Sequence, residues 1–573
     1  MLMESLILSP YEIARVIAFM SRLRDAFRPM HGKVEDDAHW RIISHVVKRF
    51  IEGGTVTLTE LIQISELPYA TAHRKINELL REHMLEKFFS GSDTKRFQLI
   101  PSNLLLDQFY NYAKDVKVEL ARVYGDKNFR NDEEYFFGGD HQALALSEDQ
   151  LRAVRNIDGV EKATFLLHND FYFMSLRHLW SDFRKRLGPY QNFHMRNMED
   201  LHAELLANAK RPESTFDIVA LNAPWVGQFA EAGAVINLNS LTDARRIVPQ
   251  SFNPEVWDMG MSKGKQFGIP SYAAVEILAA RKDLLETEGL KSPATFADVL
   301  KCGHALHDPN NGRYGIVWNA SRGIDVAHTF MFIIGCCGAP IPDLAQVKGG
   351  FEKKDMNGGK VRALIDSYAA HEALEYMKEL LSISPPNILE TSRQTVLDLF
   401  TRGKAAMAYT WSIHATRFEM QIDSAVKRRV TYLQPPFGRG GKSLAPLGGF
   451  VFAIPSNLPP LRMEKAKQIL TWMCSPEAML ARAKDGLPLS PLFSLMGDPG
   501  ANLNSPIYTL VKSLSQRRLL NVWQRPAIPK YIHIETILGE EVHDALIGHK
   551  SIKVALADAN TRIRSLDQDL LYS

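Results

Sequence analysis

The sequence has few cysteines and no apolar run long enough to cross a bilayer. Its four cysteines are clustered and show no C-x-x-C spacing; they are Cys302, Cys336, Cys337 and Cys474. This excludes a disulfide framework and a cysteine-based zinc or redox motif, so we expect reduced thiols. An apolar stretch without a charged residue, 326–342, is interrupted by glycines and prolines. It is too short for a membrane span, so we expect no membrane partner.

An export signal and a strong charge bias are also missing. The first ten residues contain no basic segment, no sustained apolar segment and no small-residue cleavage site, so we expect a cytoplasmic protein. Lys and Arg total 68 and Asp and Glu total 65, a net charge of +3. Any function that depends on charge must therefore rely on a local group of charged residues. At about 150 residues per domain, the 573 residues predict roughly three or four compact units.

Two helices separated by a tight turn are predicted in residues 57–86. Thr57 and Glu60 have the spacing of a capping box at the start of the first helix. Pro68 cannot continue that helix but suits the first turn of a second one, from about Tyr69 to Glu86. This second helix is expected to bury Ala72, Ile76, Leu79 and Leu80 and to expose Thr71, His73, Arg74, Lys75, Asn77 and Arg81.

Two short strands, at 85–89 and 97–100, are predicted next, around a basic turn. Helix, turn, helix and hairpin is the order of a winged helix, whose second helix enters the major groove of DNA. Residues 57–100 resemble the winged-helix domains of MarR-like regulators. The resemblance implies DNA-binding residues at the helix start and the wing: Tyr69, Thr71, His73, Arg74, Lys75, Lys95 and Arg96.

Two alternatives stay open in this N-terminal part. Residues 69–96 hold six basic and four acidic side chains, so the module could serve protein contacts alone. An apolar stripe then recurs at three- and four-residue steps, through Leu105, Phe109, Tyr112, Val116, Leu120 and Val123. The stripe suits helix pairing in a homodimer that reads paired half-sites. A core face within one chain explains it equally well.

A polar, acidic connector at 126–160 is predicted to join a domain at 1–125 to a larger one at 161–573. From Lys162 onward, predicted strands alternate with predicted helices, which indicates an α/β architecture. The predicted strands at 163–168 and 216–221 are followed by Asn169 and Asp170, and by Asn222 and Trp225. Ligands of open α/β sheets bind beyond such strand ends.

The run at 216–233 resembles a signature of family 1 solute-binding proteins, the carbohydrate receptors of ABC importers. Further runs match in the same order, at 268–272 with 281–284, 293–298 with 312–315, 403–411, and 448–455 with 472–477. The resemblance implies two lobes that close on a ligand about a hinge. We therefore expect a multidomain chain, with an N-terminal α(+β) winged helix and a C-terminal α/β, two-lobed, periplasmic-binding-protein-like fold. The family's Tyr-Asn pair is Ala280-Arg281 here, which leaves a hinge or packing role open.

Sugars present apolar C–H faces and polar hydroxyl edges, so a site for them needs flat aromatic rings and hydrogen-bonding groups. By the resemblance, the ligand-binding residues are Asn169, Asp170, Asn222, Trp225, Tyr272, Glu276, Trp318, Trp411, Gly448 and Gly449. Core packing is the alternative for each aromatic ring, and Trp180 and Trp472 are expected in the core.

Motifs for catalysis, metal binding and nucleotide binding are missing. Residues 438–443 lack the first glycine of a phosphate loop, because Pro436 stands there. His304 and His307 have no third metal ligand in the pattern, and no G-x-S-x-G motif occurs. Paired carboxylates could make a glycosidase, but the sequence does not locate them. We expect no enzyme, no cofactor and no metal.

The sequence therefore predicts a cytoplasmic, homodimeric one-component transcriptional regulator. It would bind operator DNA through the winged helix and sense a small sugar, polyol or sugar derivative between the lobes. One alternative is a non-transporting or transport-associated sugar-binding protein whose N-terminal module only mediates dimerisation. A hydrolase on the same fold is the other.

Overall fold

The computed structural model describes residues 37–51, 55–88, 97–124, 162–170, 172–173, 176, 193–341, 346–347, 350–351, 365–420, 424–439, 444–479, 490–492, 506–522 and 524–568. The predicted connector at 126–160 lies outside these ranges. Two compact units make up the chain: residues 1–145 with 164–206, and residues 146–163 with 207–573. None of the described helices combines the length and the apolar character that crossing a bilayer would require.

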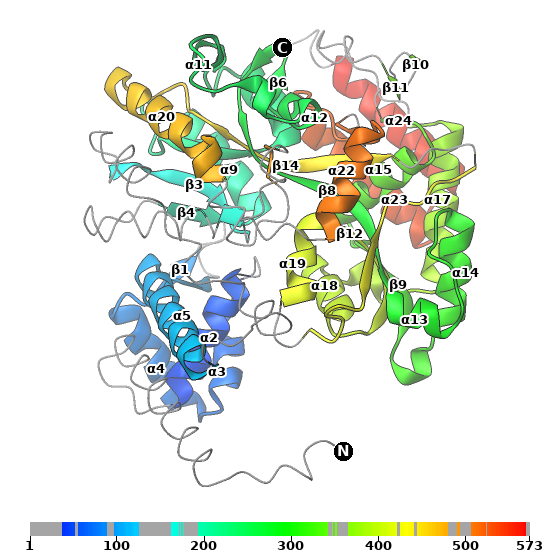
Figure 1. Cartoon of the computed structure of the whole chain (residues 1–573), viewed down its shortest axis with the longest axis horizontal. Helices are drawn as coiled ribbons and strands as arrows, with labels where there is room; N and C mark the ends of the chain where they lie inside the picture. The colour runs from blue at the N-terminus through cyan, green and yellow to red at the C-terminus, as the bar shows by residue number, and fades with distance from the viewer. Residues whose placement is uncertain are drawn as a thin grey trace. The chain divides into compact units, whose positions relative to one another are not determined.

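Among the described residues of the first unit, three helices come first in the chain (Figure 1): α2 (Asp37–Ile51), α3 (Leu58–Ser65) and α4 (Tyr69–Arg81). Thr57 caps α3 by accepting the Glu60 N–H at 3.2 Å, as the sequence predicts, while the Glu60 carboxylate lies 2.8 Å from His45 Nε2. Helix α4 ends at Arg81 rather than near Glu86. The prediction was too long because His83 takes a left-handed φ of 55° and turns the chain into the next strand.

Strands β1 (Leu85–Phe88) and β2 (Gln98–Pro101) pair antiparallel, and α5 (Asn103–Tyr124) follows. Helix α4 buries Ala72, Ile76 and Leu79, whereas Leu80 is only half-buried. In α5, Phe109 stacks on Trp40 of α2 with 5.7 Å between ring centroids, and Tyr112 meets the same indole edge-on at 5.4 Å. For these two residues the apolar stripe packs within the chain. The unit also holds the parallel pair β3 (Phe165–His168) and β4 (Phe193–Arg196), followed by α9 (Met198–Ala209).

The second unit is built on a sheet with the order β5, β14, β8, β12, β9. These strands are β5 (Ile218–Asn222), β14 (Ala445–Ala453), β8 (Ile269–Arg281), β12 (Ala405–Trp411) and β9 (Tyr314–Val317); β13 (Val430–Leu433) also pairs with β8, and β15 (Leu520–Asn521) with β14. Strand β8 has 13 buried residues. One half of it pairs with β14 and the other half with β12 and β13. Strand β8 therefore connects two groups of strands, β14 and β5 on one side and β12, β13 and β9 on the other.

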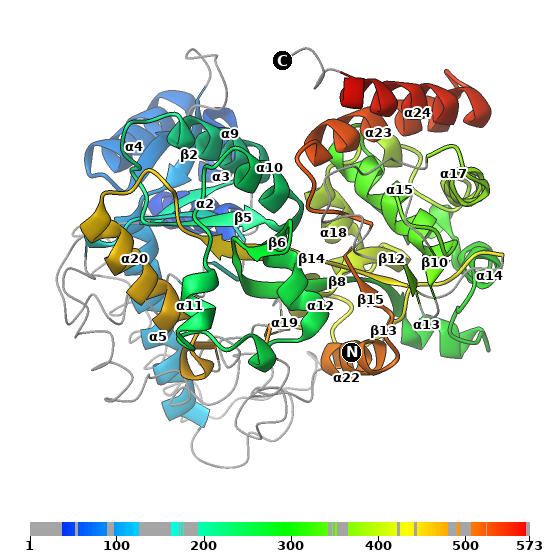
Figure 2. The ribbon, with the colours of Figure 1, turned by 90° about the horizontal axis from the view of Figure 1, so that it is seen from above.

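Helices cover both groups (Figure 2), with α10, α11, α12 and α20 around one and α14, α15, α17 and α23 around the other. The remaining bounds are α10 (Val226–Glu231), α11 (Asn239–Asp243), α12 (Pro254–Trp257), α13 (Lys282–Thr287), α14 (Phe296–Leu306), α15 (Ile324–Cys336), α17 (Tyr368–Leu381), α18 (Arg393–Thr401), α19 (Ala415–Met420), α20 (Pro460–Met473), α22 (Pro506–Gln516), α23 (Tyr531–Leu546) and α24 (Ile552–Gln568). Short strand pairs are β6 (Met261–Ser262) with β7 (Lys265–Gln266), and β10 (Gln346–Val347) with β11 (Gly350–Phe351). This arrangement is the expected two-lobed α/β fold.

Helix α15 explains the apolar stretch at 326–342. Eleven of its residues, from Val326 to Cys336, are buried. It packs between α17 and α23 and against β14, and a helix that is surrounded by protein is apolar on all its faces. All four cysteines are free thiols, as predicted.

Candidate ligand-binding site

Four of the predicted ligand-binding residues lie on one face of four neighbouring strands. Glu276 of β8 pairs directly with Trp411 at the end of β12. Gly448 of β14 pairs with Ala274, two residues before Glu276, and Asn222 at the end of β5 pairs with Phe450, two residues after Gly448. Cross-strand partners and residues two apart share a face of a sheet. The register therefore gathers these side chains in the second unit.

Arg525, which sequence reasoning missed, joins three of them. Its Nη2 donates to Asn222 Oδ1 at 3.1 Å, and its guanidinium lies 5.6 Å from the centroid of the Trp411 ring. A Cβ on Gly448 would lie 2.7 Å from Cη2 and Cζ3 of Trp411 and 3.2 Å from Nη1 of Arg525. Only glycine fits there without a shift. We call Asn222, Glu276, Trp411, Gly448 and Arg525 the Arg525 cluster.

Arg525 is 9% exposed. Its Nε donates to the Tyr531 hydroxyl at 3.0 Å, and that hydroxyl donates to Glu535 Oε1 at 2.9 Å. Glu535 also contacts Nε2 of His328 on α15. Burial alone would raise the pKa of Glu535, but His328 and Arg525 outweigh it and lower the pKa, so this carboxylate is ionised. Burial and Arg525 lower the pKa of His328.

Glu276 is 5% exposed and receives no hydrogen bond from any residue in the ranges that the structure describes. Burial raises its pKa from 4.5 to about 8, although the positive charges of Arg525 and Arg393 act in the opposite direction. At neutral pH its carboxyl group is therefore mostly protonated. A buried carboxyl group without a partner can both donate and accept a hydrogen bond to a bound molecule.

Other predicted residues of the second unit lie near these strands. The Tyr272 ring is buried, with its centroid 5.9 Å from that of Phe450. Gly449 has φ +131°, and a Cβ there would lie 2.4 Å from the Tyr272 carbonyl oxygen, so glycine is required. Trp225 is buried in a short 3-10 helix, Ala223–Trp225, directly after β5. Trp318 is fully buried, and its indole N–H donates to Ser384 Oγ at 2.9 Å.

Asn169 and Asp170 belong to the first unit. Asn169 is buried, and its Oδ1 has no hydrogen-bond partner among the described residues. Asp170 shapes the turn after β3. Its Oδ1 accepts the Phe173 N–H at 2.9 Å, and its Oδ2 lies 3.0 Å from His168 Nδ1.

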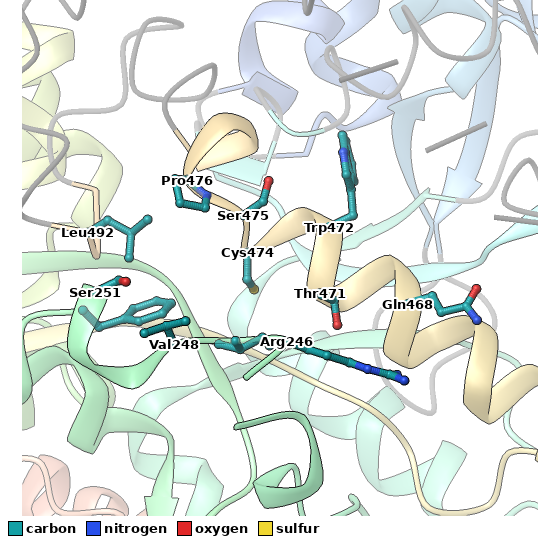
Figure 3. Close-up of a pocket in the computed structure, with 12 residues that line it drawn as sticks. Arg246, Val248, Ser251, Gln468, Thr471, Trp472, Cys474, Ser475, Pro476 and Leu492 are labelled. Carbon is teal, nitrogen blue, oxygen red and sulfur yellow. The ribbon is translucent and has the colours of Figure 1, made fainter. Parts of the chain in front are cut away.

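A separate cavity of about 490 Å³ lies elsewhere in the second unit (Figure 3). It is lined by Arg246, Ile247, Val248, Ser251, Phe252, Gln468, Thr471, Trp472, Cys474, Ser475, Pro476 and Leu492. Thr471 and Cys474 point toward Arg246 and Val248. None of the predicted ligand-binding residues lines this cavity. Trp472, expected in the core, is half-buried at its wall.

The predicted DNA-binding residues that the structure describes surround the start of α4. Tyr69 is 67% exposed and stacks on His73, with 5.9 Å between ring centroids. Arg74 is exposed and lies 3.9 Å from Glu78, whereas Thr71 and Lys75 are half-buried. Lys95 and Arg96 lie outside the described residues. An exposed aromatic and basic helix start is therefore present.

The chain matches the family model of bacterial extracellular solute-binding proteins over residues 184–498, more than half of its length. It is 24% identical over 307 residues to the maltotriose-binding protein of Pyrococcus abyssi, covering 52% of this chain and 59% of that protein. The chain thus spans little more than half the length of this relative. Putative binding proteins of Brucella abortus and Brucella suis match over 34% of this chain and 44% of their own length at 24% identity.

Solved structures share the fold. A solute-binding protein of Agrobacterium radiobacter in complex with ribitol superposes with a TM-score of 0.62 at 24% identity, covering 70% of this chain and 98% of that one. One from Agrobacterium vitis with bound D-mannitol gives a TM-score of 0.59 at 20% identity, covering 71% and 98%. At these identities the likeness shows the fold alone.

Proposed function

Because the chain belongs to the bacterial extracellular solute-binding protein family, we propose that its two-lobed part binds a small sugar, polyol or sugar derivative at the Arg525 cluster. One observation carries the proposal: a partly exposed indole, Trp411, lies beside buried polar groups, two of which keep hydrogen-bonding capacity free. Those two are the Glu276 carboxyl group and the Arg525 guanidinium.

The chemistry of the cluster suits a polyhydroxylated molecule. A flat ring such as Trp411 contacts the C–H face of a sugar, and the carboxyl and guanidinium groups bond its hydroxyl edges. Relatives with the same fold are described as bound to ribitol, D-mannitol and α-D-tagatose. These names support the ligand class proposed for this chain. Binding without chemical conversion is the proposed activity.

Calorimetric titration of the full chain with ribitol, D-mannitol, tagatose and maltose tests this proposal. We expect at least one of them to bind and Trp411→Ala to weaken its affinity about tenfold or more, because a stacking surface is removed. Trp472→Ala is the matched control, since Trp472 lines the separate cavity, and should leave the affinity unchanged. The proposal fails if none of the compounds binds, or if Trp411→Ala and Trp472→Ala bind alike.

A second candidate function, DNA binding, is favoured by the exposed start of α4. The order of α3, a turn, α4 and the β1–β2 hairpin supports a winged helix of the MarR-like type. The polar and basic side chains at the start of α4 are where such a domain contacts DNA. In this proposal the protein acts in the cytoplasm as a homodimeric regulator, and sugar binding alters its affinity for DNA.

Selection of bound duplexes from a random DNA pool, followed by a shift assay, tests this second function. We expect the Arg74→Ala, Lys75→Ala double variant to lose most of its affinity, whereas Arg517→Ala in the other unit keeps it. If DNA does not bind, or binds regardless of these changes, then the alternative of a sugar-binding protein with a dimerising N-terminal module is favoured.

A further inference from the structure

Arg525 is a buried cation without a direct counter-charge. Its two side-chain hydrogen bonds go to neutral groups, the Asn222 amide oxygen and the Tyr531 hydroxyl. It forms no ion pair with any carboxylate in the described part of the chain. A guanidinium has five N–H donors, so donors of Arg525 remain unused. Removing a charge from water is costly unless it is paired.

The two carboxyl groups whose charge acts on Arg525, Glu276 and Glu535, do not contact it directly. Glu276 is mostly protonated at neutral pH, because it is buried. Glu535 is ionised, but the Tyr531 hydroxyl stands between it and Arg525, so it makes no direct contact with the guanidinium. The guanidinium of Arg525 therefore has no negatively charged partner beside Asn222 and Trp411.

Two other arginines of the second unit, unlike Arg525, contact a carboxylate directly. Arg393 donates from Nε to Asp325 Oδ1 at 2.9 Å, and Arg417 pairs with Asp398. Both cations therefore have a carboxylate of their own. The Arg525 guanidinium is more deeply buried than Arg393 and would need a partner more.

Unpartnered amides lie in the same segment. Asn521 is 2% exposed and Gln524 is 1% exposed. Neither the amide nitrogen nor the amide oxygen of either side chain has a hydrogen-bond partner among the described residues. The Gln524 amide packs on α15, where a Cβ on Gly335 would lie 2.6 Å from its Nε2. Buried polar groups without a protein partner are uncommon in folded proteins, so these two amides call for an explanation.

We propose that the ligand of the Arg525 cluster is an acidic sugar derivative whose single carboxylate pairs with Arg525. This rests on the proposed function and narrows its ligand class from polyols and sugars in general to aldonic or uronic acids. The ligand carboxylate would accept N–H donors from the guanidinium in the forked geometry that arginine favours. The Glu276 carboxyl group, directly opposite Trp411 in the sheet, would bond hydroxyl groups of the same ligand.

A monoanion matches the cluster better than a phosphate ester. Only one guanidinium there lacks a direct counter-charge, so a second negative charge on the ligand would itself be buried without a partner. Ribonate and mannonate carry one charge on the carbon skeletons of ribitol and mannitol, whereas ribitol 5-phosphate carries close to two at neutral pH. These compounds separate the effect of charge from that of the skeleton.

The test is calorimetric titration of the full chain with ribitol, ribonate and ribitol 5-phosphate, and with the mannitol and mannonate pair. We expect the carboxylate to bind about tenfold or more tightly than the neutral polyol of the same skeleton, and more tightly than the phosphate ester. Equal or tighter binding of the neutral polyol overturns the inference and leaves the proposed function intact. The tightest binding by the phosphate overturns the choice of a monoanion, and no binding of any compound overturns the proposed function itself.

Variants of Arg525 test whether this residue causes the preference for the carboxylate ligand over the neutral polyol. Arg525→Gln should abolish the preference for ribonate over ribitol, and Arg525→Lys should keep part of it, because lysine retains the charge but loses the fork. Arg517→Gln, an arginine bonded to Gln434 outside the cluster, is the matched control and should keep the full preference. Circular dichroism reports whether each variant folds. A ribonate preference that survives in folded Arg525→Gln overturns the assignment to Arg525.

Discussion

At the scale of single residues, the sequence predicts the four strand residues of the cluster but not its cation. Asn222 follows a predicted strand end, whereas Trp411 and Gly448 belong to runs that match the family. Arg525 gives no such signal, because a buried arginine and an exposed one look the same in a sequence. Its role depends on contacts with Asn222 and Trp411, which are 303 and more than a hundred residues away in the chain.

Gly448 gives the first prediction at this scale. A methyl group there would meet the Trp411 ring at 2.7 Å, so Gly448→Ala should displace the indole. We expect a loss of ligand affinity of about tenfold or more and a loss of stability of about 1–3 kcal/mol, as for overpacking. Gly264→Ala is the control. It has φ +74° and open space around it, so it should cost stability without changing the affinity, measured by urea unfolding and calorimetry. Unchanged affinity in Gly448→Ala would contradict the site.

Glu276 gives the second prediction at this scale. Its pKa is about 8 in the folded chain against 4.5 in the unfolded chain, so the folded state binds more protons between these values. Its contribution to stability is therefore complete below about pH 4.5 and is lost as the pH rises through about 8. Glu276→Gln cannot titrate. We expect the stability difference, wild type minus Glu276→Gln, to fall by a few kcal/mol between pH 5 and pH 8.5 in urea unfolding. A difference that stays constant with pH would refute the buried, protonated carboxyl.

At the scale of elements, local signals predict where helices begin better than where they end. Thr57 begins α3 as predicted, because a cap depends on residues three apart. The end of α4 was missed, because the left-handed turn at His83 has no strong local signal: histidine is tolerated there but not diagnostic. The apolar stripe after the hairpin fits both helix pairing in a homodimer and a core face within one chain. The spacing of apolar residues does not identify the surface that they pack against. The Trp40 contact decides between these two explanations for Phe109 and Tyr112.

A double-mutant cycle on two caps tests this account of helix starts. At α14 the capping box is reciprocal, because Thr295 accepts from the Asp298 N–H while the Asp298 carboxylate accepts from the Thr295 N–H. Thr295→Ala and Asp298→Ala should each cost about 1 kcal/mol and be non-additive in urea unfolding. At α3 the Glu60 carboxylate bonds His45 instead, so Thr57→Ala and Glu60→Ala should be additive. The reverse pattern would contradict the hydrogen bonding described.

At the scale of the whole molecule, ordered resemblances along the chain predict the two-lobed fold correctly. Many short matches in the same order constrain a topology far more than one motif does. The charge of the proposed ligand could not be predicted from the sequence, because it depends on the charge balance around Arg525, Glu276 and Glu535. That balance arises only when β8, α23 and the segment between β15 and α23 come together.

Ligand binding should stabilise the second unit as a whole. A ligand present at about a hundred times its Kd adds about 2.7 kcal/mol to the free energy of unfolding. We expect the corresponding rise in Tm in scanning calorimetry of the wild type, and about half of that rise or less in Trp411→Ala at the same ligand concentration, because a tenfold weaker affinity leaves the ligand at about ten times its Kd. A similar rise in both proteins would place the ligand elsewhere.

The most direct test of the central claim is a crystal structure of the full chain grown with ribonate or, failing that, ribitol. The account predicts ligand density against the Trp411 ring, with polar contacts to Arg525 and Glu276. Density in the cavity beside Trp472, or anywhere that leaves Trp411 and Arg525 untouched, would contradict it.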